Sequence, residues 1–253
     1  MPSLKYILFS FSLLLFNGCQ NPPQVTHVLK SLNAENRAMC RDGGCPDLQV
    51  TYPVFSGDTV VAKKINLFIT DWIRSTLFMG DDSSPTATEI TQALDQYLLM
   101  AKDYQPELTH RNNYSGRLAA DVTFSNHAMV TLKFTAQFNT AIDAKKSKTA
   151  YVSVDTSTGQ LISLDDLVAQ KEALTTILGQ QTNALELFSS IGLVTVQKQY
   201  EYWQQNKSVG FNTYGLVVID QSTSASQGKK FVQPTGQLPW NKILAYLNPK
   251  YFP

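Results

Sequence analysis

Two consecutive amphipathic helical segments between residues 59 and 103 constrain the fold of this chain most strongly. In TVVAKKINLFITDWIRSTLF (59–78), apolar residues recur every three to four positions, which is typical of a helix with one buried face. The apolar positions are Val61, Ile65, Phe68, Ile69, Trp72, Ile73 and Leu77. A second helix of the same kind is predicted from Thr86 to Asp103. Such helices need a surface on which to bury their apolar faces.

The flanking segments provide that surface, because they have the composition and alternation of strands. In 127–140, Met129, Thr131 and Lys133 alternate with apolar neighbours, and Asn126 suits a hairpin turn before this strand. The predicted strands are 48–55, 116–125, 127–140, 150–156, 211–222 and 229–234. Further helices are predicted over 171–188, 192–205 and 239–247, with Gly179 as a candidate break in the first. We therefore expect an α+β fold with a mainly antiparallel sheet and helices packed on one side.

The N-terminus has the pattern of an export signal. An apolar run from Tyr6 to Phe16 follows Lys5 and is shorter than the roughly 20 residues that span a bilayer. The run ends in LFNGC, which resembles the bacterial lipoprotein box, so we expect residues 1–18 to be removed and Cys19 to carry lipid. An ordinary signal peptide with an incidental cysteine is the alternative. With Gln20 after the cysteine, the pattern is compatible with anchoring in the outer membrane, facing the periplasm.

Cys40 and Cys45 are close enough in sequence to form a small disulfide ring. The intervening Arg-Asp-Gly-Gly permits a tight turn, and an oxidising compartment would allow the bond to form. A metal site with His27 is the alternative, although zinc usually takes four protein ligands. Residues 19–46 are predicted to be a tether that ends in this ring, and no cofactor is expected.

Charge and motifs narrow the function classes. The formal net charge is +1, so no broad basic face for nucleic acid is expected. No HExxH or GxSxG motif is present, and Asp165 and Asp166 fit a helix cap begun by Ser163 better than an acid–base pair. These observations favour a protein that is not an enzyme. A cell-wall-active enzyme and a structural accessory of an envelope complex are the rival classes.

Aromatic residues between 200 and 214 are the candidate ligand-binding residues. Rigid aromatic rings can anchor a protein or a sugar. The candidates are Tyr200, Tyr202, Trp203 and Tyr214. The alternative is that several of these rings simply close the core.

The order of segments resembles the RsiV-like domain. The matching features are YPVFSGD, a long helix containing INLFI, paired strands, DTSTGQLISLDDL, a strand of the kind FNTYGLVVI and a terminal LPWNKILAYL. The domain occurs in a lysozyme-sensing anti-sigma factor and in the non-catalytic N-terminal region of PdaC-type peptidoglycan deacetylases. The resemblance implies that residues 47–253 form an RsiV-like α+β domain that binds or senses lysozyme or a peptidoglycan fragment.

Overall fold

The computed structural model contains two β-sheets and the helices that pack on them. It describes residues 25–41, 45–57, 59–78, 85–104, 114–140, 146–181, 195–198, 201, 209–219 and 236–253. Within this part of the chain, six strands form the larger sheet and three form the smaller one. The α+β class predicted from the sequence is confirmed.

The larger sheet follows chain order. Its strands are β1 (His27–Asn33), β2 (Asp47–Phe55), β3 (Tyr114–Ser125), β4 (Met129–Thr140), β5 (Lys146–Asp155) and β6 (Leu161–Ile162). Neighbouring strands are antiparallel except β2 and β3, which are parallel. A parallel pair needs a long crossover, and the two predicted helices lie between these strands in the chain. The sheet is therefore mainly antiparallel, as predicted.

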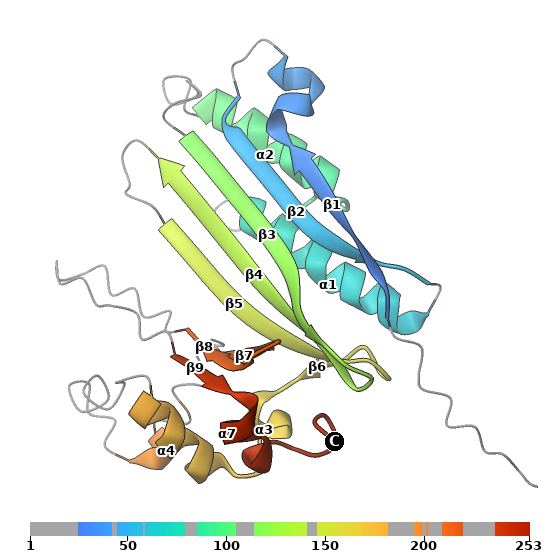
Figure 1. Ribbon diagram of the computed structural model, residues 1–253. Coiled ribbons are helices and arrows are strands. Elements are labelled where there is room, and N and C mark those ends of the chain that lie inside the picture. The colour runs from blue at the N-terminus through green and yellow to red at the C-terminus, as the bar shows by residue number, and fades with distance from the viewer. Residues whose placement is uncertain are drawn as a thin grey trace, which may run out of the picture.

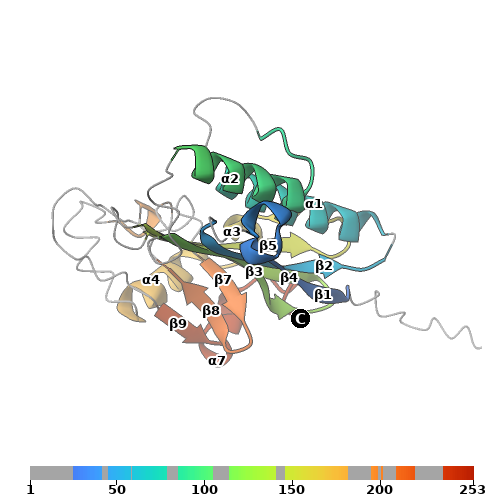
Figure 2. The same cartoon turned by 90° about the horizontal axis from the view of Figure 1, so that it is seen from above.

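The crossover consists of α1 (Val60–Leu77) and α2 (Ile90–Tyr104), which cover one face of this sheet (Figure 2). The side chain of Thr59 caps α1 by accepting a hydrogen bond from the backbone N–H of Ala62 at 3.1 Å. Apolar side chains on one face of α1 are buried against the sheet: Ile65, Ile69, Ile73 and Leu77. The helical periodicity in the sequence thus identified the buried face correctly.

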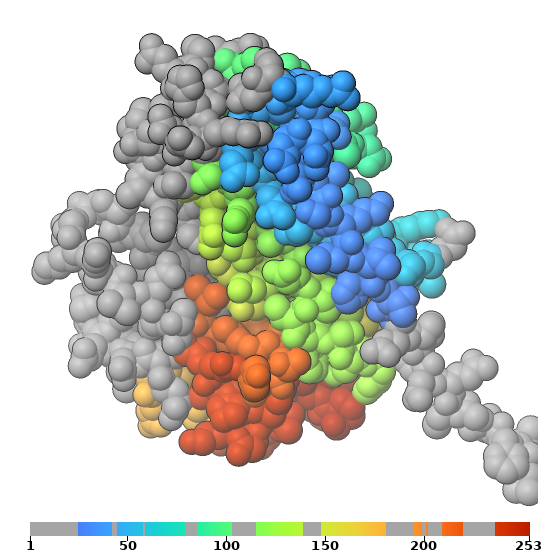
Figure 3. Space-filling model, turned by 45° about the horizontal axis from the view of Figure 1, so that its top comes forward, coloured from blue at the N-terminus to red at the C-terminus, as the bar shows by residue number. Residues whose placement is uncertain are grey.

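The smaller sheet packs on the other face, at one end of the larger sheet (Figures 1 and 2). Its strands are β7 (Val209–Asn212), β8 (Gly215–Val218) and β9 (Gly236–Pro239). Around it lie α3 (Leu164–Leu167), α4 (Lys171–Gln181), α7 (Trp240–Ile243) and the 3₁₀ turn η3 (Leu244–Tyr246). In Figure 3 the orange and red C-terminal segments lie directly beside the green strands. A second hydrophobic core fills this junction.

The predicted tether over residues 19–46 is wrong from residue 27 onwards. Residues 27–33 form β1, which pairs with β2 along its whole length, from His27 opposite Phe55 to Asn33 opposite Gln49. The strand was missed because its side chains are mostly exposed and therefore resemble those of a linker. Its backbone pairing does not depend on apolar side chains. The folded domain thus begins before residue 47, the predicted boundary.

The predicted strand 211–222 is also wrong, because a turn divides it into β7 and β8. Asn212 Oδ1 accepts hydrogen bonds from the backbone N–H groups of Tyr214 and Gly215, at 2.9 and 3.1 Å. Gly215 has φ +149°, a conformation that side-chain-bearing residues rarely adopt. Asn212 and Gly215 are typical turn residues and were the available signal, but the apolar residues on either side of them favoured a single strand.

Other predictions have mixed outcomes. Asn126 does form the β3–β4 hairpin, since its Oδ1 accepts hydrogen bonds from the N–H groups of Ala128 and Met129 at 2.9 and 2.8 Å. Helix α4 continues through Gly179, so this residue is not a break. Most of the predicted helix 192–205 and the predicted strand 229–234 lie outside the described residues.

Candidate ligand-binding groove

A groove with a volume of about 330 Å³ lies where the two sheets meet, beside the edge of β5. This volume falls within the range of small ligand-binding pockets. The described residues that line it come from α1, β5, β6, α3, the residue before α3, and β7: Phe68, Tyr151, Val152, Ser153, Leu161, Ile162, Ser163, Leu164, Leu167 and Val209. The groove therefore depends on the packing of segments that are far apart in the sequence.

The groove has two apolar walls, one from each hydrophobic core. Phe68 and Val152 pack with the core beneath α1 and α2. Ile162 and Val209 belong to the core around the smaller sheet. Strand geometry explains the division, because successive residues of a strand point to opposite faces of the sheet.

β7 forms part of the second wall because its backbone packs closely against the larger sheet. Gly210 has no Cβ, and its backbone lies against the ring of Tyr151. Thr123, on β3, also contacts β7: its Oγ1 donates a hydrogen bond to the carbonyl oxygen of Phe211 at 2.7 Å. Thr123 lies at an irregularity in the β3–β4 register, which explains why its side chain is free to bind β7.

The polar groups of the groove are few, and two of them are already paired. Ser153 Oγ and Thr131 Oγ1 are 3.0 Å apart, and Ser163 Oγ donates to Asp166 at 2.6 Å. Burial raises the pKa of Tyr151. None of the described lining residues has a carboxylate, imidazole, amine or thiol group. These residues favour the burial of apolar groups.

Tyr214 is the one predicted aromatic candidate that the structure describes. It lies in the β7–β8 turn with 73% of its surface exposed, at the opposite end of β7 from Val209. The structure therefore does not bring Tyr214 into the groove. The neighbouring Trp240 supports the turn, because its indole N–H donates to the carbonyl oxygen of Thr213 at 3.0 Å. Tyr200, Tyr202 and Trp203 lie outside the described residues.

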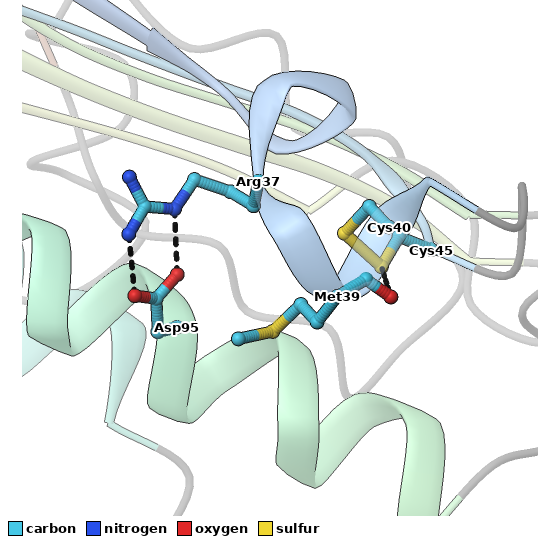
Figure 4. Close-up of a disulfide and its surroundings, with 5 residues drawn as sticks. All are labelled: Arg37, Met39, Cys40, Cys45 and Asp95. Atoms are coloured by element: carbon cyan, nitrogen blue, oxygen red, sulfur yellow. Dashed lines mark hydrogen bonds and ion pairs between the residues drawn. A yellow bond between two sulfur atoms is a disulfide. The ribbon is translucent and has the colours of Figure 1, made fainter.

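The predicted disulfide between Cys40 and Cys45 is present, with a sulfur–sulfur distance of 2.05 Å. Both cysteines are buried in the core beside α2 (Figure 4). Since they bind each other, the alternative metal site with His27 is not formed, and the described residues contain no cluster of metal-ligating side chains. Cys19 lies outside the described residues.

An ion pair next to the disulfide joins the N-terminal segment to α2. The guanidinium of Arg37 donates to both carboxylate oxygens of Asp95, at 2.6 and 2.5 Å (Figure 4). Such bidentate pairs fix both distance and orientation. The segment that precedes β2 is therefore held to the domain by side-chain contacts as well as by backbone pairing.

The acidic pair Asp165–Asp166 has the structural role predicted for it. The Ser163 side chain caps α3 by accepting from the backbone N–H of Asp166, and the Asp166 carboxylate accepts from the backbone N–H of Ser163, which completes a capping box. Asp165 forms an ion pair with Lys171. Neither carboxylate lines the groove among the residues described there.

Sequence reasoning missed the buried carboxylate of Asp155. Burial disfavours its charged form, but hydrogen bonds from Ser157, Lys250 and the backbone of Thr158 outweigh this effect. The pKa of Asp155 is therefore far below its ordinary value. The hydroxyl of Tyr251 also lies 3.4 Å from Oδ2 of Asp155. The sequence Asp-Thr-Ser-Thr-Gly (155–159) could have revealed this role of Asp155. The side chain of an aspartate often accepts hydrogen bonds from the backbone N–H groups of the turn that it begins.

Comparison with known proteins identifies the fold. No protein-family model matches this chain, and no curated protein matches it. A crystal structure of a DUF3298 family protein from Pseudomonas aeruginosa PAO1 matches with a TM-score of 0.58 and 13% identity, over 92% of this chain and 98% of that one. This chain shares the fold of that protein. DUF3298 is the family of the RsiV and PdaC N-terminal-like domains, so the resemblance found in the sequence is confirmed at the level of fold.

A second structural neighbour is a member of the same family from Bacteroides fragilis NCTC 9343. It matches with a TM-score of 0.49 and 14% identity, over 88% of this chain and 92% of that one.

In the described part of the chain, no helix combines the length and apolarity needed to cross a bilayer.

Proposed function

We propose that this chain is a lipid-anchored bacterial envelope protein whose α+β domain binds a protein ligand without catalysing a reaction. The groove between the two sheets is the observation that carries the proposal. Its described walls are apolar, and none of their residues is a carboxylate or a histidine. An enzyme site is expected to gather titratable groups in its cleft, whereas a binding site needs complementary apolar surface.

The location is proposed from the N-terminal pattern. The LFNGC sequence supports lipid attachment at Cys19, and Gln20 is compatible with anchoring in the outer membrane, facing the periplasm. The Cys40–Cys45 disulfide fits an exported protein, because such bonds persist in oxidising compartments. The β1 strand begins at His27, so a short segment connects the proposed anchor to the domain.

Lysozyme is the proposed protein ligand, on the strength of the resemblance to the RsiV-like domain. A peptidoglycan fragment is the second candidate, and Tyr214 favours it because an exposed aromatic ring offers a flat surface to a sugar. The acidic residues that we expect near a basic lysozyme are Asp81, Asp82, Asp103 and Glu107. Their side chains lie outside the described part of the structure.

The test is calorimetric titration of the mature, full-length protein in mild detergent with lysozymes and with muropeptides. Leu161→Asp is the informative variant, because Leu161 lines the groove and is 56% exposed, so its replacement leaves the core intact. Leu244→Asp is the matched control, since Leu244 is similarly exposed, at 47%, but is not among the lining residues. We expect lysozyme binding that Leu161→Asp weakens at least about tenfold and Leu244→Asp leaves unchanged.

Product analysis by mass spectrometry completes this test. Intact muropeptides after prolonged incubation are expected for a binding protein. Turnover of muropeptides would overturn the proposal in favour of the cell-wall-active enzyme. Binding of muropeptides without lysozyme binding would make the peptidoglycan fragment the ligand. If neither ligand binds, the structural accessory role replaces the proposal.

A further inference from the structure

The beginnings of β1 and α1 lie together at one end of the domain (Figures 1 and 2). The hydroxyl oxygens of Thr26 and Ser56 are 3.0 Å apart, and the N–H of Ser56 donates to the carbonyl oxygen of Thr26 at 2.9 Å. From α1, the side chain of Asn66 binds both the N–H and the carbonyl oxygen of Phe55, the last residue of β2, at 2.8 and 2.9 Å. These contacts join the first turns of α1 to the start of β1 in one continuous surface.

This end of the domain exposes apolar side chains. Val28 and Leu29 of β1 are 60% and 65% exposed, and Val60 and Leu67 of α1 are 67% and 59% exposed. Val28 is on the same face of the sheet as α1, because it alternates with Leu32, which packs against the core beneath that helix. Four of the eight large apolar side chains that are exposed in the described residues therefore lie here, and such a group marks an interaction surface. We call the described residues of 25–29 and 56–67 the β1–α1 surface.

A lysine lies between the apolar residues of α1. Val60, Lys63 and Leu67 share one exposed side of the helix, since they are three and four residues apart. This side becomes acidic one turn later, at Asp71. The β1–α1 surface contains no aspartate or glutamate among its described residues, and Asp58, in the same stretch of sequence, lies outside them. Apolar side chains with lysine among them suit the boundary between acyl chains and headgroups, because a lysine can keep its ammonium in water there.

The β1–α1 surface is also close to the proposed site of lipid attachment. Val25, the first described residue, packs against the core beneath α1. It follows Cys19 by six residues, so even a fully extended chain keeps Val25 within about 22 Å of that cysteine. Lipid on Cys19 enters the bilayer, so the bilayer surface lies within the same short distance of this end of the domain.

We propose that the β1–α1 surface lies against the phospholipid bilayer that holds the anchor. Val28, Val60 and Leu67 contact the acyl chains, and Lys63 contacts anionic headgroups. The inference rests on the proposed lipid attachment, and it goes beyond that attachment by assigning the side of the domain that faces the membrane. A surface of this size binds lipid weakly by itself, but the tether keeps the bilayer at a high effective concentration.

The first experiment measures the depth of single nitroxide labels in the full-length, acylated protein. The protein is reconstituted in vesicles of phosphatidylethanolamine and phosphatidylglycerol, with the label on Val60→Cys, Leu67→Cys or Leu99→Cys. Collisions with oxygen report contact with acyl chains, whereas collisions with a nickel chelate report contact with water. The native pair Cys40 and Cys45 does not take the label, because the two residues are bonded to each other.

Leu99 is the matched reference position. It is an exposed apolar residue of α2, at 48%, and it follows Asp95 by one helical turn. Asp95 is bound by Arg37, which lies beyond the far end of β1. We expect the ratio of oxygen to chelate collisions at Val60→Cys and Leu67→Cys to exceed the ratio at Leu99→Cys at least about fivefold, since the labels enter the acyl boundary.

The second experiment places carboxylates on the surface and reads the label at Val28→Cys. Val60→Asp combined with Leu67→Asp is expected to lower the ratio at this label at least about threefold, because carboxylates are excluded from the acyl boundary. Leu99→Asp combined with Leu244→Asp is the matched control and is expected to leave the ratio unchanged. All four side chains are largely exposed, so both double variants keep the core intact.

Several results would overturn the proposal. Equal ratios at positions 60, 67 and 99 would show that another side of the domain meets the bilayer. Reduced collisions with both reagents would show that protein, such as a second copy of this chain, covers the surface. An unchanged ratio at Val28→Cys in Val60→Asp with Leu67→Asp would exclude the assigned contacts.

The fate of the lipid anchor is measured separately by incorporation of labelled fatty acid and by flotation with the vesicles. Protein that carries the fatty acid and floats, but whose nitroxide labels all remain in water, would leave lipid attachment standing and reject the bilayer contact alone. Protein without fatty acid on Cys19 would reject the anchor and this inference with it. Lysozyme binding in the groove is a third, independent readout, because the β1–α1 surface does not include Leu161.

Discussion

Gly210 of β7 lies directly against the ring of Tyr151 on β5: a Cβ added to Gly210 would stand 2.2 Å from both Cγ and Cδ1 of that ring. A side chain at position 210 would force the ring of Tyr151 or one of the two strands to move. The contact fixes how closely the smaller sheet approaches the larger one, and Val209, the residue before Gly210, lines the groove. The close approach of these two residues therefore sets the shape of the candidate site.

Gly210→Ala is expected to destabilise the protein by about 1–3 kcal/mol through overpacking. Urea unfolding of the variant and the wild type measures this difference. In a Tyr151→Ala background the same substitution meets no ring, so its cost is expected to shrink and the two changes to be non-additive. An equal cost in both backgrounds would show that the Tyr151 contact is not the cause.

Asp155→Asn is expected to destabilise the protein at neutral pH by about 1–3 kcal/mol, because it weakens a buried hydrogen-bonded carboxylate network. The folded-state pKa of Asp155 lies below its unfolded value of about 3.9. Its stabilisation is therefore complete above that value and is lost as the pH falls towards the folded-state pKa.

Urea unfolding of wild type and Asp155→Asn at pH 7 and at decreasing acidic pH measures this dependence. The gap between the two proteins is expected to narrow below about pH 4. Asp71→Asn is the control, because Asp71 is an exposed partner of Arg74 and is expected to matter little. A gap that stays constant down to the lowest pH would contradict the assigned role of Asp155.

Replacement of both Cys40 and Cys45 by alanine is expected to cost about 2 kcal/mol, because the bond closes only a short ring. The loss is expected to be local: amides of β1 exchange faster while those of β4, in the centre of the sheet, do not. Hydrogen exchange followed by mass spectrometry measures both regions. In the wild type, the intact mass should rise by two hydrogen atoms on reduction. Two thiols that react freely before reduction would refute the bond.

Cys19→Ser is expected to abolish incorporation of labelled fatty acid and to leave an unprocessed or soluble product. The reason is that only Cys19 lies at the end of the signal-like run, while Cys40 and Cys45 are bonded to each other. Metabolic labelling followed by membrane fractionation provides the measurement. The variant without Cys40 and Cys45 is the control and should keep its label. Label that persists in Cys19→Ser would exclude lipid attachment at this residue.

Features governed by neighbouring residues were predictable from the sequence. The buried face of α1 follows from the spacing of Ile65, Ile69 and Ile73, because helix geometry places these residues on one side. The Asn126 hairpin and the Ser163–Asp166 capping box are equally local, since each forms within four residues of the chain. The Cys40–Cys45 ring also belongs here, because a short loop leaves few other partners.

Features that depend on distant segments were decided only by the tertiary structure. β1 has an exposed, linker-like sequence, and its pairing with β2 relies on backbone groups that every sequence possesses. The role of Gly210 depends on Tyr151, which is far from it in the chain.

The groove belongs to this second group, because its described walls come from both cores. Periodicity shows which face of a strand or helix is apolar, but not which surface will cover that face. The sequence therefore determined the kinds of elements and their buried faces. The packing of the two sheets decided where the groove formed, because that depends on contacts between residues that no local pattern links.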